Sequence, residues 1–276
     1  MTRRAFPWDL GTVLQRRRGL DFGRVSIYLG AMPAINFPDM LIWYVAFLLS
    51  FTSHEAAHAF AAMRGGDLTA YLGGQVSLNP LPHIERSPFG TVVVPFISFV
   101  LWGWMIGWAS APYDPHWALR YPRRAAWMAA AGPAANLLIC VAAFFMLKFG
   151  LSNGWFLTPE WRDMFDAEGR FQLTRIVLSS GPAWVGVGKL LSVLFALNLI
   201  LFIFNLFPFP PLDGSSVVTL FMSERLAYRY TTFMQQPMFS FIGLILAWRL
   251  FGMVFGKIFV NSFMLLHYSG SQPPGF

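Results

Sequence analysis

Long apolar stretches, separated by shorter polar ones, dominate the sequence from residue 38 onward. A run of about 20 apolar residues is long enough to cross the hydrocarbon core of a bilayer as a helix. The pattern therefore predicts an all-α polytopic membrane protein with about five transmembrane helices. We expect these helices at about 39–63, 89–110, 125–149, 184–206 and 237–266. The last stretch contains Arg249 and Lys257, so it could instead lie in the membrane interface.

Residues 67–88, between the first two apolar stretches, have a different pattern. Thr, Tyr, Gly and Val are frequent up to Leu78, and a proline-rich turn follows. This composition predicts a short β-hairpin after the first helix. Residues 150–183 form the largest polar region, which we expect to be water-exposed and partly helical.

The chain before residue 38 is mixed in pattern and basic, with six arginines among residues 3–24. We expect a basic N-terminal segment at 1–37, with one short strand at 25–29, and one membrane-embedded domain at 38–276. Segments rich in arginine tend to stay on the cytoplasmic side of a membrane, so these arginines would place the N-terminus inside.

The composition supports a membrane protein and excludes several other classes. Only 12% of the residues are charged, against about 25% in soluble domains, and the mean hydropathy is +0.52. The net charge of +7 is typical of basic residues beside a bilayer, and no basic patch interleaved with aromatic residues points to nucleic acid. A single cysteine, Cys140, excludes an intrachain disulfide and a cysteine-based zinc site.

The sequence His54-Glu55-Ala56-Ala57-His58 lies inside the first apolar stretch. A charge at bilayer depth costs roughly 2.5 kcal/mol or more, so polar groups here need a function or a partner. On a helix His54 and His58 share one face, and that spacing allows both to bind one tetrahedral metal ion. Glu55 is one step around the helix, close enough to act on a water at the metal. The alternative is a polar helix face that packs on neighbouring helices.

The fourth apolar stretch ends in a segment that cannot continue as a helix, because three of the four residues at 208–211 are proline. Irregular backbone at membrane depth is tolerated only where protein or a water-filled cavity covers it. Asp213 follows this segment directly. Together with the two histidines it would supply three protein ligands and leave a fourth position open, which is the arrangement of a catalytic zinc site. Asp213 could instead cap a helix over 214–230, or serve both roles.

These motifs together resemble the site-2 protease family of intramembrane zinc metalloproteases. The resemblance spans about residues 40–220 and includes Gly132-Pro133-Ala134-Ala135-Asn136 in the third apolar stretch. The second motif of the family runs Asn-x-x-Pro-x-Pro-x-Leu-Asp-Gly. This chain matches every specified position, with Asn205, Pro208, Pro210, Leu212, Asp213 and Gly214.

Two further stretches, residues 77–85 and Gly107-Trp108-Ala109, resemble the bacterial branch of the family. We expect the branch without a PDZ or CBS domain. Bacterial relatives often have lysine where this chain has Ser110. Family members usually run the first-motif helix toward the cytoplasm, which would place the preceding segment outside, so the membrane orientation stays open.

The resemblance implies a zinc-dependent metalloendopeptidase that cuts within or near the transmembrane segments of membrane proteins. It implies Zn²⁺ as cofactor, with His54, His58 and Asp213 as metal ligands and Glu55 as the catalytic base. The implied partners are a transmembrane protein substrate and the lipid bilayer, with no nucleic acid and no defined oligomeric state. The implied location is a bacterial inner (plasma) membrane.

A helical substrate would have to unwind before its peptide carbonyl could reach zinc. The unpaired backbone of 205–211, or the hairpin expected at 67–78, could receive unwound substrate as an added strand. Asn136, Asn205, Pro208 and Pro210 are therefore candidate substrate-binding residues. The two asparagines could instead make interhelical hydrogen bonds.

Two other functions are compatible with parts of the pattern. A catalytically silent relative would bind a membrane partner or a metal without cleaving, but it would have no need for Glu55. A metal transporter would need a chain of polar residues across the bilayer, whereas the sequence offers one cluster.

Overall fold

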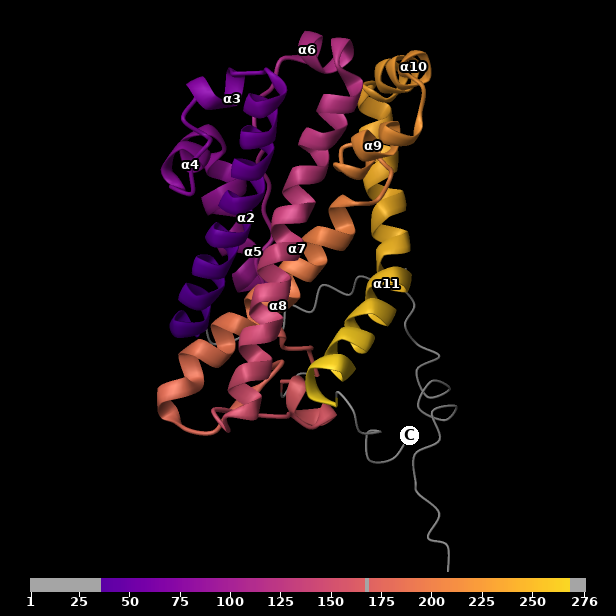
Figure 1. Cartoon of the computed structure of the whole chain (residues 1–276). Coiled ribbons are helices and arrows are strands. Elements are labelled where there is room, and N and C mark those ends of the chain that lie inside the picture. The colour runs from indigo at the N-terminus through magenta and orange to yellow at the C-terminus, as the bar shows by residue number, and fades with distance from the viewer. Residues whose placement is uncertain (1–35, 167–168, 269–276) are drawn as a thin grey trace, which may run out of the picture. The chain divides into compact units, whose positions relative to one another are not determined.

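Helices form most of the part of the chain that the computed structural model describes, residues 36–166 and 169–268 (Figure 1). Within these ranges, four segments are long and apolar enough to cross a membrane. They are α2 (Phe37–Gly65), α7 (Pro122–Ser152), Pro182–Asn205, which contains α8 (Val185–Asn205), and α11 (Pro237–His267). The predicted all-α polytopic fold is confirmed. The strand expected at 25–29 lies outside the described residues.

Helix α2 begins and ends at residues that suit those positions. The Asn36 side chain accepts a hydrogen bond from Asp39 N at 3.1 Å, which caps the first turn. Gly66 ends the helix with a φ of 99°, a left-handed conformation that glycine adopts without steric cost. The helix carries the His54–His58 motif in its last four turns, close to its C-terminal end.

The centre of the described region consists of α2, α7 and α8, each of which contacts the other two. Their facing sides form a continuous apolar core that includes Phe47, Leu147 and Phe195. Helix α11 packs at the edge of this group, and 11% of its most apolar window is buried, against 61% for the segment containing α8. The exposed apolar surface of α11 is what a lipid-facing helix presents. The apolar stretch expected at 237–266 thus corresponds to one continuous helix, α11.

The helix predicted at 89–110 is shorter than expected. A π-helical turn, η1 (Phe89–Val93), leads into α5 (Val94–Trp102), which ends at Gly103 with a φ of 78°. Residues 104–114 have no regular structure and lead to α6 (Pro115–Arg120). Apolar composition alone did not reveal this break, because the residues after Gly103 are also mostly uncharged. The helix from 89 to 102 is too short to cross the bilayer unaided.

The β-hairpin predicted within residues 67–78 is wrong. This region contains the short helix α3 (Thr69–Leu72), which is followed by turns and by α4 (Leu81–Arg86). A carboxylate oxygen of Asp67 accepts a hydrogen bond from Thr69 N at 2.9 Å, and this local bond favours a helical turn over a strand. Gly74 then turns the chain with a φ of 72°.

The antiparallel strand pair that the structure does contain lies in the polar region 150–183. Strand β1 (Phe156–Leu157) pairs with β2 (Leu178–Ser179), with Phe156 opposite Ser179. The described residues of this region also form three 3₁₀ turns, η2 (Trp161–Met164), η3 (Leu173–Arg175) and η4 (Pro182–Trp184). It is partly helical, as predicted, and it joins α7 to α8.

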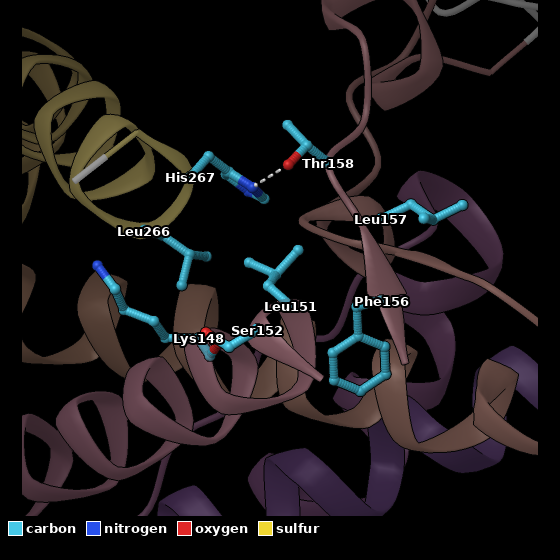
Figure 2. Close-up of a pocket in the computed structure, with 8 residues that line it drawn as sticks. All are labelled: Lys148, Leu151, Ser152, Phe156, Leu157, Thr158, Leu266 and His267. Atoms are coloured by element: carbon cyan, nitrogen blue, oxygen red, sulfur yellow. Dashed lines mark hydrogen bonds between the residues drawn. The ribbon is translucent and has the colours of Figure 1, made fainter. Parts of the chain in front are cut away.

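An open pocket of about 400 Å³ lies where the C-terminal ends of α7 and α11 meet β1 (Figure 2). The His267 ring makes hydrogen bonds to the Thr158 hydroxyl at 3.1 Å and to Ile176 O at 3.0 Å, so it fastens the end of α11 to the polar region. Lys148 Nζ donates to Leu265 O at 3.1 Å. Lys148 is 16 residues beyond Gly132, which is about 24 Å along α7. This pocket is therefore separate from the site described next.

Candidate metal centre and active site

Three side chains from two distant parts of the sequence meet in the interior. His54 and His58 come from α2, and Asp213 is the residue before α9 (Gly214–Val217). Their ligand atoms all lie within 4.8 Å of one another. The two Nε2 atoms are 3.0 Å apart, and Asp213 Oδ2 and Oδ1 lie 3.2 Å and 3.4 Å from those of His54 and His58, respectively. The predicted spacing of four residues does place both imidazoles on one face of the helix.

Hydrogen bonds on the far side of each imidazole define which nitrogen carries the proton. His58 Nδ1 lies 2.7 Å from Met128 O, and a backbone carbonyl only accepts, so this Nδ1 must donate. His54 Nδ1 lies 2.6 Å from Asn136 Oδ1 and donates in the same way. The Nε2 atom of each neutral ring then presents a lone pair to the centre of the site.

The orientation of the Asn136 amide is itself fixed by a buried network. Its Nδ2 donates to Ser50 O at 3.2 Å and to Asn198 Oδ1 at 2.8 Å. Asn198 Nδ2 donates in turn to Ser50 Oγ at 2.8 Å and to Leu194 O at 2.8 Å. The network leaves Asn136 Oδ1 to face His54. Asn136 is 0% exposed and lies behind the imidazole, in interhelical hydrogen bonds that join α2, α7 and α8.

The donor atoms at the centre of the site fit a metal cation. Two lone pairs that face each other at 3.0 Å repel unless a positive charge lies between them. Asp213 Oδ2 is buried and has no hydrogen-bond partner among the described residues. The Asp213 side chain makes no capping bond to α9, so Asp213 occupies the capping position without capping the helix. Two imidazoles and one carboxylate are a donor set that zinc accepts. The three side chains that offer these donor atoms are those predicted from the sequence, His54, His58 and Asp213.

Glu55 lies beside the histidines on α2 and is 5% exposed. Its Oε2 accepts a hydrogen bond from Ala111 N at 2.5 Å. Ala111 belongs to the irregular segment that follows α5, so two parts of the chain meet at this carboxylate. Sequence reasoning did not assign a role to Ala111, because a backbone donor leaves no trace in the identity of the residue.

Helix α7 approaches the site so closely that only glycine fits at residue 132. A Cβ there would lie 2.6 Å from His54 Nε2 and 2.5 Å from His58 Cε1. Gly132 therefore forms a wall of the site with backbone alone. Sequence reasoning noted the motif at 132–136 but assigned no role to its glycine. The signal was its position four residues before Asn136, which places both on one face of a helix.

The irregular segment between α8 and Asp213 has the predicted proline break. Asn205 ends α8, and its Nδ2 donates to Leu201 O in the same helix at 3.0 Å. Pro208 is exposed, whereas Pro210 is buried. The Pro210 carbonyl lies against Gly243 of α11, where a Cβ would collide with it. Helix α11 therefore supports the segment that carries Asp213.

Comparison with known proteins places the sequence in one family. Residues 42–250 match the sequence profile of peptidase family M50. The chain therefore belongs to peptidase family M50, the site-2 protease family, as the motifs predicted. No solved structure matches the chain.

Two bacterial relatives carry zinc metalloprotease names. "Putative zinc metalloprotease YwhC" of Bacillus subtilis (strain 168) is 32% identical over 187 residues, which cover 67% of this chain and 71% of that protein. "Putative zinc metalloprotease Rip2" of Mycolicibacterium smegmatis is 29% identical over 181 residues, which cover 65% of this chain and 57% of that protein.

The family and the apolar helices together define the class of the protein. It is an integral membrane zinc metalloendopeptidase with Zn²⁺ as cofactor, as the sequence predicted. The alternatives of a silent relative and a metal transporter are not favoured by these findings.

Proposed function

We propose that His54, His58 and Asp213 hold one zinc ion, and that Glu55 is the base in hydrolysis of peptide bonds within or near transmembrane segments. The observation that carries this proposal is the convergence of the three ligand atoms within 4.8 Å, with both histidine tautomers set for metal binding. Because both relatives described above come from bacteria, we further propose that the protein resides in a bacterial plasma membrane.

Bound zinc would polarise the scissile carbonyl and favour attack by water at neutral pH. The residues of the chain supply the other steps. Glu55 would accept a proton from the attacking water and return it to the nitrogen of the leaving amine. Asn136 and the Met128 carbonyl would keep the imidazoles oriented during these transfers. Because both histidines and Glu55 are less than 10% exposed, bulk water has little access to the reacting atoms.

We propose that the irregular segment 206–212 receives unwound substrate. Its residues form turns and bends, and Pro208 is exposed on it. Asn205 is the last residue of α8, and its Nδ2 uses one N–H for Leu201 O, so the second N–H of this partly buried amide would donate to a substrate carbonyl. Pro210 would act indirectly, since its contact with α11 holds the segment in place. The contacts of Asn136 favour a positioning role over direct substrate binding.

Metal analysis combined with a cleavage assay tests this proposal. Protein purified into lipid nanodiscs should contain about one zinc per chain. His54→Ala and Asp213→Ala should each lose most of it, whereas His116→Ala, which changes an exposed histidine on α6, should not. Full zinc retention in both ligand variants would contradict the assigned ligands.

Glu55→Gln tests the role of Glu55 as the base independently of zinc binding. This variant should keep its zinc and its fold yet fail to cleave a reconstituted membrane substrate. Glu85→Gln, on the exposed side of α4, is the matched control and should cleave normally. Cleavage by Glu55→Gln near the wild-type rate would exclude Glu55 as the base.

A further inference from the structure

The irregular segment 104–114, here called the strap, contacts α2, the helix that carries Glu55. Trp108 N donates to Gly90 O at 3.2 Å, which joins the strap to η1. A Cβ at Gly107 would collide with the Gly90 carbonyl and with the Phe47 ring of α2. The glycine at 107 therefore allows the strap to run in direct contact with α2.

The strap reaches the active site through one hydrogen bond. Ala111 N–H donates to Glu55 Oε2, and it is the hydrogen-bond partner of this carboxylate within the described residues. An ionised carboxylate only accepts hydrogen bonds, and bonds of this kind to a charged group are stronger than neutral ones. With Oε2 held by the strap, Oε1 remains for the water that loses a proton.

Two further bonds hold the strap on either side of this contact. Before Ala111, Arg86 Nε donates to Ser110 O at 3.0 Å. After it, Asp114 N donates to Asp67 Oδ2 at 2.9 Å. Arg86 is the last residue of α4, and Asp67 lies two residues beyond Gly65, where α2 ends. The strap is therefore fastened to α4 on one side of Ala111 and, on the other, just beyond the C-terminal end of the helix that carries Glu55.

Asp67 is suited to this role by its own surroundings. It is 4% exposed, and its Oδ1 accepts from Thr69 N at 2.9 Å and from Thr69 Oγ1 at 2.5 Å. Burial alone would raise the pKa of the Asp67 carboxyl, but the hydrogen bonds from Thr69 and from Asp114 N outweigh it and hold the pKa below its ordinary value. The two carboxylate oxygens serve different elements, since Oδ1 binds α3 and Oδ2 binds the strap.

We propose that the strap orients the catalytic base, with the Ala111 N–H holding Glu55 Oε2 and Asp67 acting as a positioning residue that keeps the strap in place. The inference rests on the proposed role of Glu55. A base that is free to rotate spends less time with an oxygen directed at the water, and a displacement of about 1 Å can cost about 100-fold in rate. Loss of the strap contact should therefore lower kcat without weakening the binding of substrate or metal.

Asp67→Ala tests the proposal, with Thr69→Val as the matched control. Asp67→Ala removes the acceptor for Asp114 N, whereas Thr69→Val removes only the hydroxyl bond to the other oxygen. In nanodiscs, Asp67→Ala should lower kcat by about 10- to 100-fold with KM within about twofold of wild type. Its zinc content should be unchanged, and Thr69→Val should keep the wild-type kcat. Asp67→Asn, which retains one carbonyl oxygen, should fall between.

Ala111→Pro gives an independent measurement, because it deletes the N–H that contacts Glu55. It should reproduce the kcat loss with zinc retained. An unchanged kcat in folded, zinc-bound Asp67→Ala or Ala111→Pro would overturn the proposal, and so would a loss that appears only in KM. If Asp67→Ala does not fold, Asp67→Asn decides by the same criteria. Wild-type activity in Glu55→Gln would instead refute the proposed function, so the two failures are distinguishable.

Discussion

Replacing Gly132 with alanine should remove zinc from the site while leaving the fold intact. The added Cβ would lie 2.6 Å from His54 Nε2 and 2.5 Å from His58 Cε1. Non-bonded carbon contacts are optimal at about 3.5 Å, so each ring would have to retreat by about 1 Å. Zinc–imidazole distances tolerate only about 0.2 Å, and α7 is itself packed on both sides.

The expected loss follows from that displacement. Disturbing the groups that orient metal ligands costs about 10- to 100-fold in affinity, and moving the ligands themselves should cost at least as much. Alanine favours a helix over glycine by up to about 1 kcal/mol, so the global stability of the apoprotein should not fall through the backbone. Weak zinc binding in a well-folded protein is thus the expected combination.

Competition with a chromophoric chelator measures the zinc affinity, and a thermal melt of metal-free protein measures the fold. Gly252→Ala on α11 is the matched control, because a Cβ at that position meets nothing within 4 Å. It should leave zinc affinity and cleavage unchanged. Wild-type zinc affinity in Gly132→Ala would refute the reasoning, since the ion could then not lie between these imidazoles and α7.

Three other outcomes are expected. Asn136→Leu should weaken zinc binding by roughly 10- to 100-fold in the same competition assay, whereas Asn136→Asp, which keeps an acceptor for His54, should lose less. In liposomes, substrates with Gly or Pro near the cut should be cleaved faster than Leu-substituted versions, because Gly and Pro disfavour helix by about 1 and 3 kcal/mol; equal rates would mean that unwinding is not limiting. The depressed pKa of Asp67 contributes stability above its unfolded pKa of about 3.9, and this is lost as pH falls through the lower folded pKa. Melting temperatures below about pH 4 should therefore fall more steeply in wild type than in Asp67→Asn, and parallel curves would contradict this.

The spanning helices could be predicted because each is an apolar run whose length the bilayer dictates. The run at 184–206 corresponds to α8 at Val185–Asn205, and the run at 39–63 to α2 at Phe37–Gly65. The helix expected at 89–110 was too long for a local reason. Gly103 in a left-handed conformation ends it, and composition does not distinguish an apolar strap from an apolar helix.

The convergence of His54, His58 and Asp213, the proposed metal ligands, could be predicted because their chemistry is costly at bilayer depth and their spacing is characteristic. The residues that support them were less visible. Ala111 acts through a backbone N–H, and Gly132 acts by having no side chain. The hairpin expected at 67–78 failed because the Asp67 carboxylate accepts a hydrogen bond from Thr69 N, and this local bond favours a helical turn over a strand.

The wall that Gly132 forms has a consequence for how substrate selectivity can diverge in such proteins. Because α7 meets the imidazoles with main chain alone, no side chain on that wall can be exchanged to reshape the cleft without displacing the ligands. Variation must instead enter through the two irregular segments beside the site, the strap and residues 206–212. On the proposed ligand set, the helices that carry the imidazoles and Gly132 would stay constant while these segments change which substrates are cut.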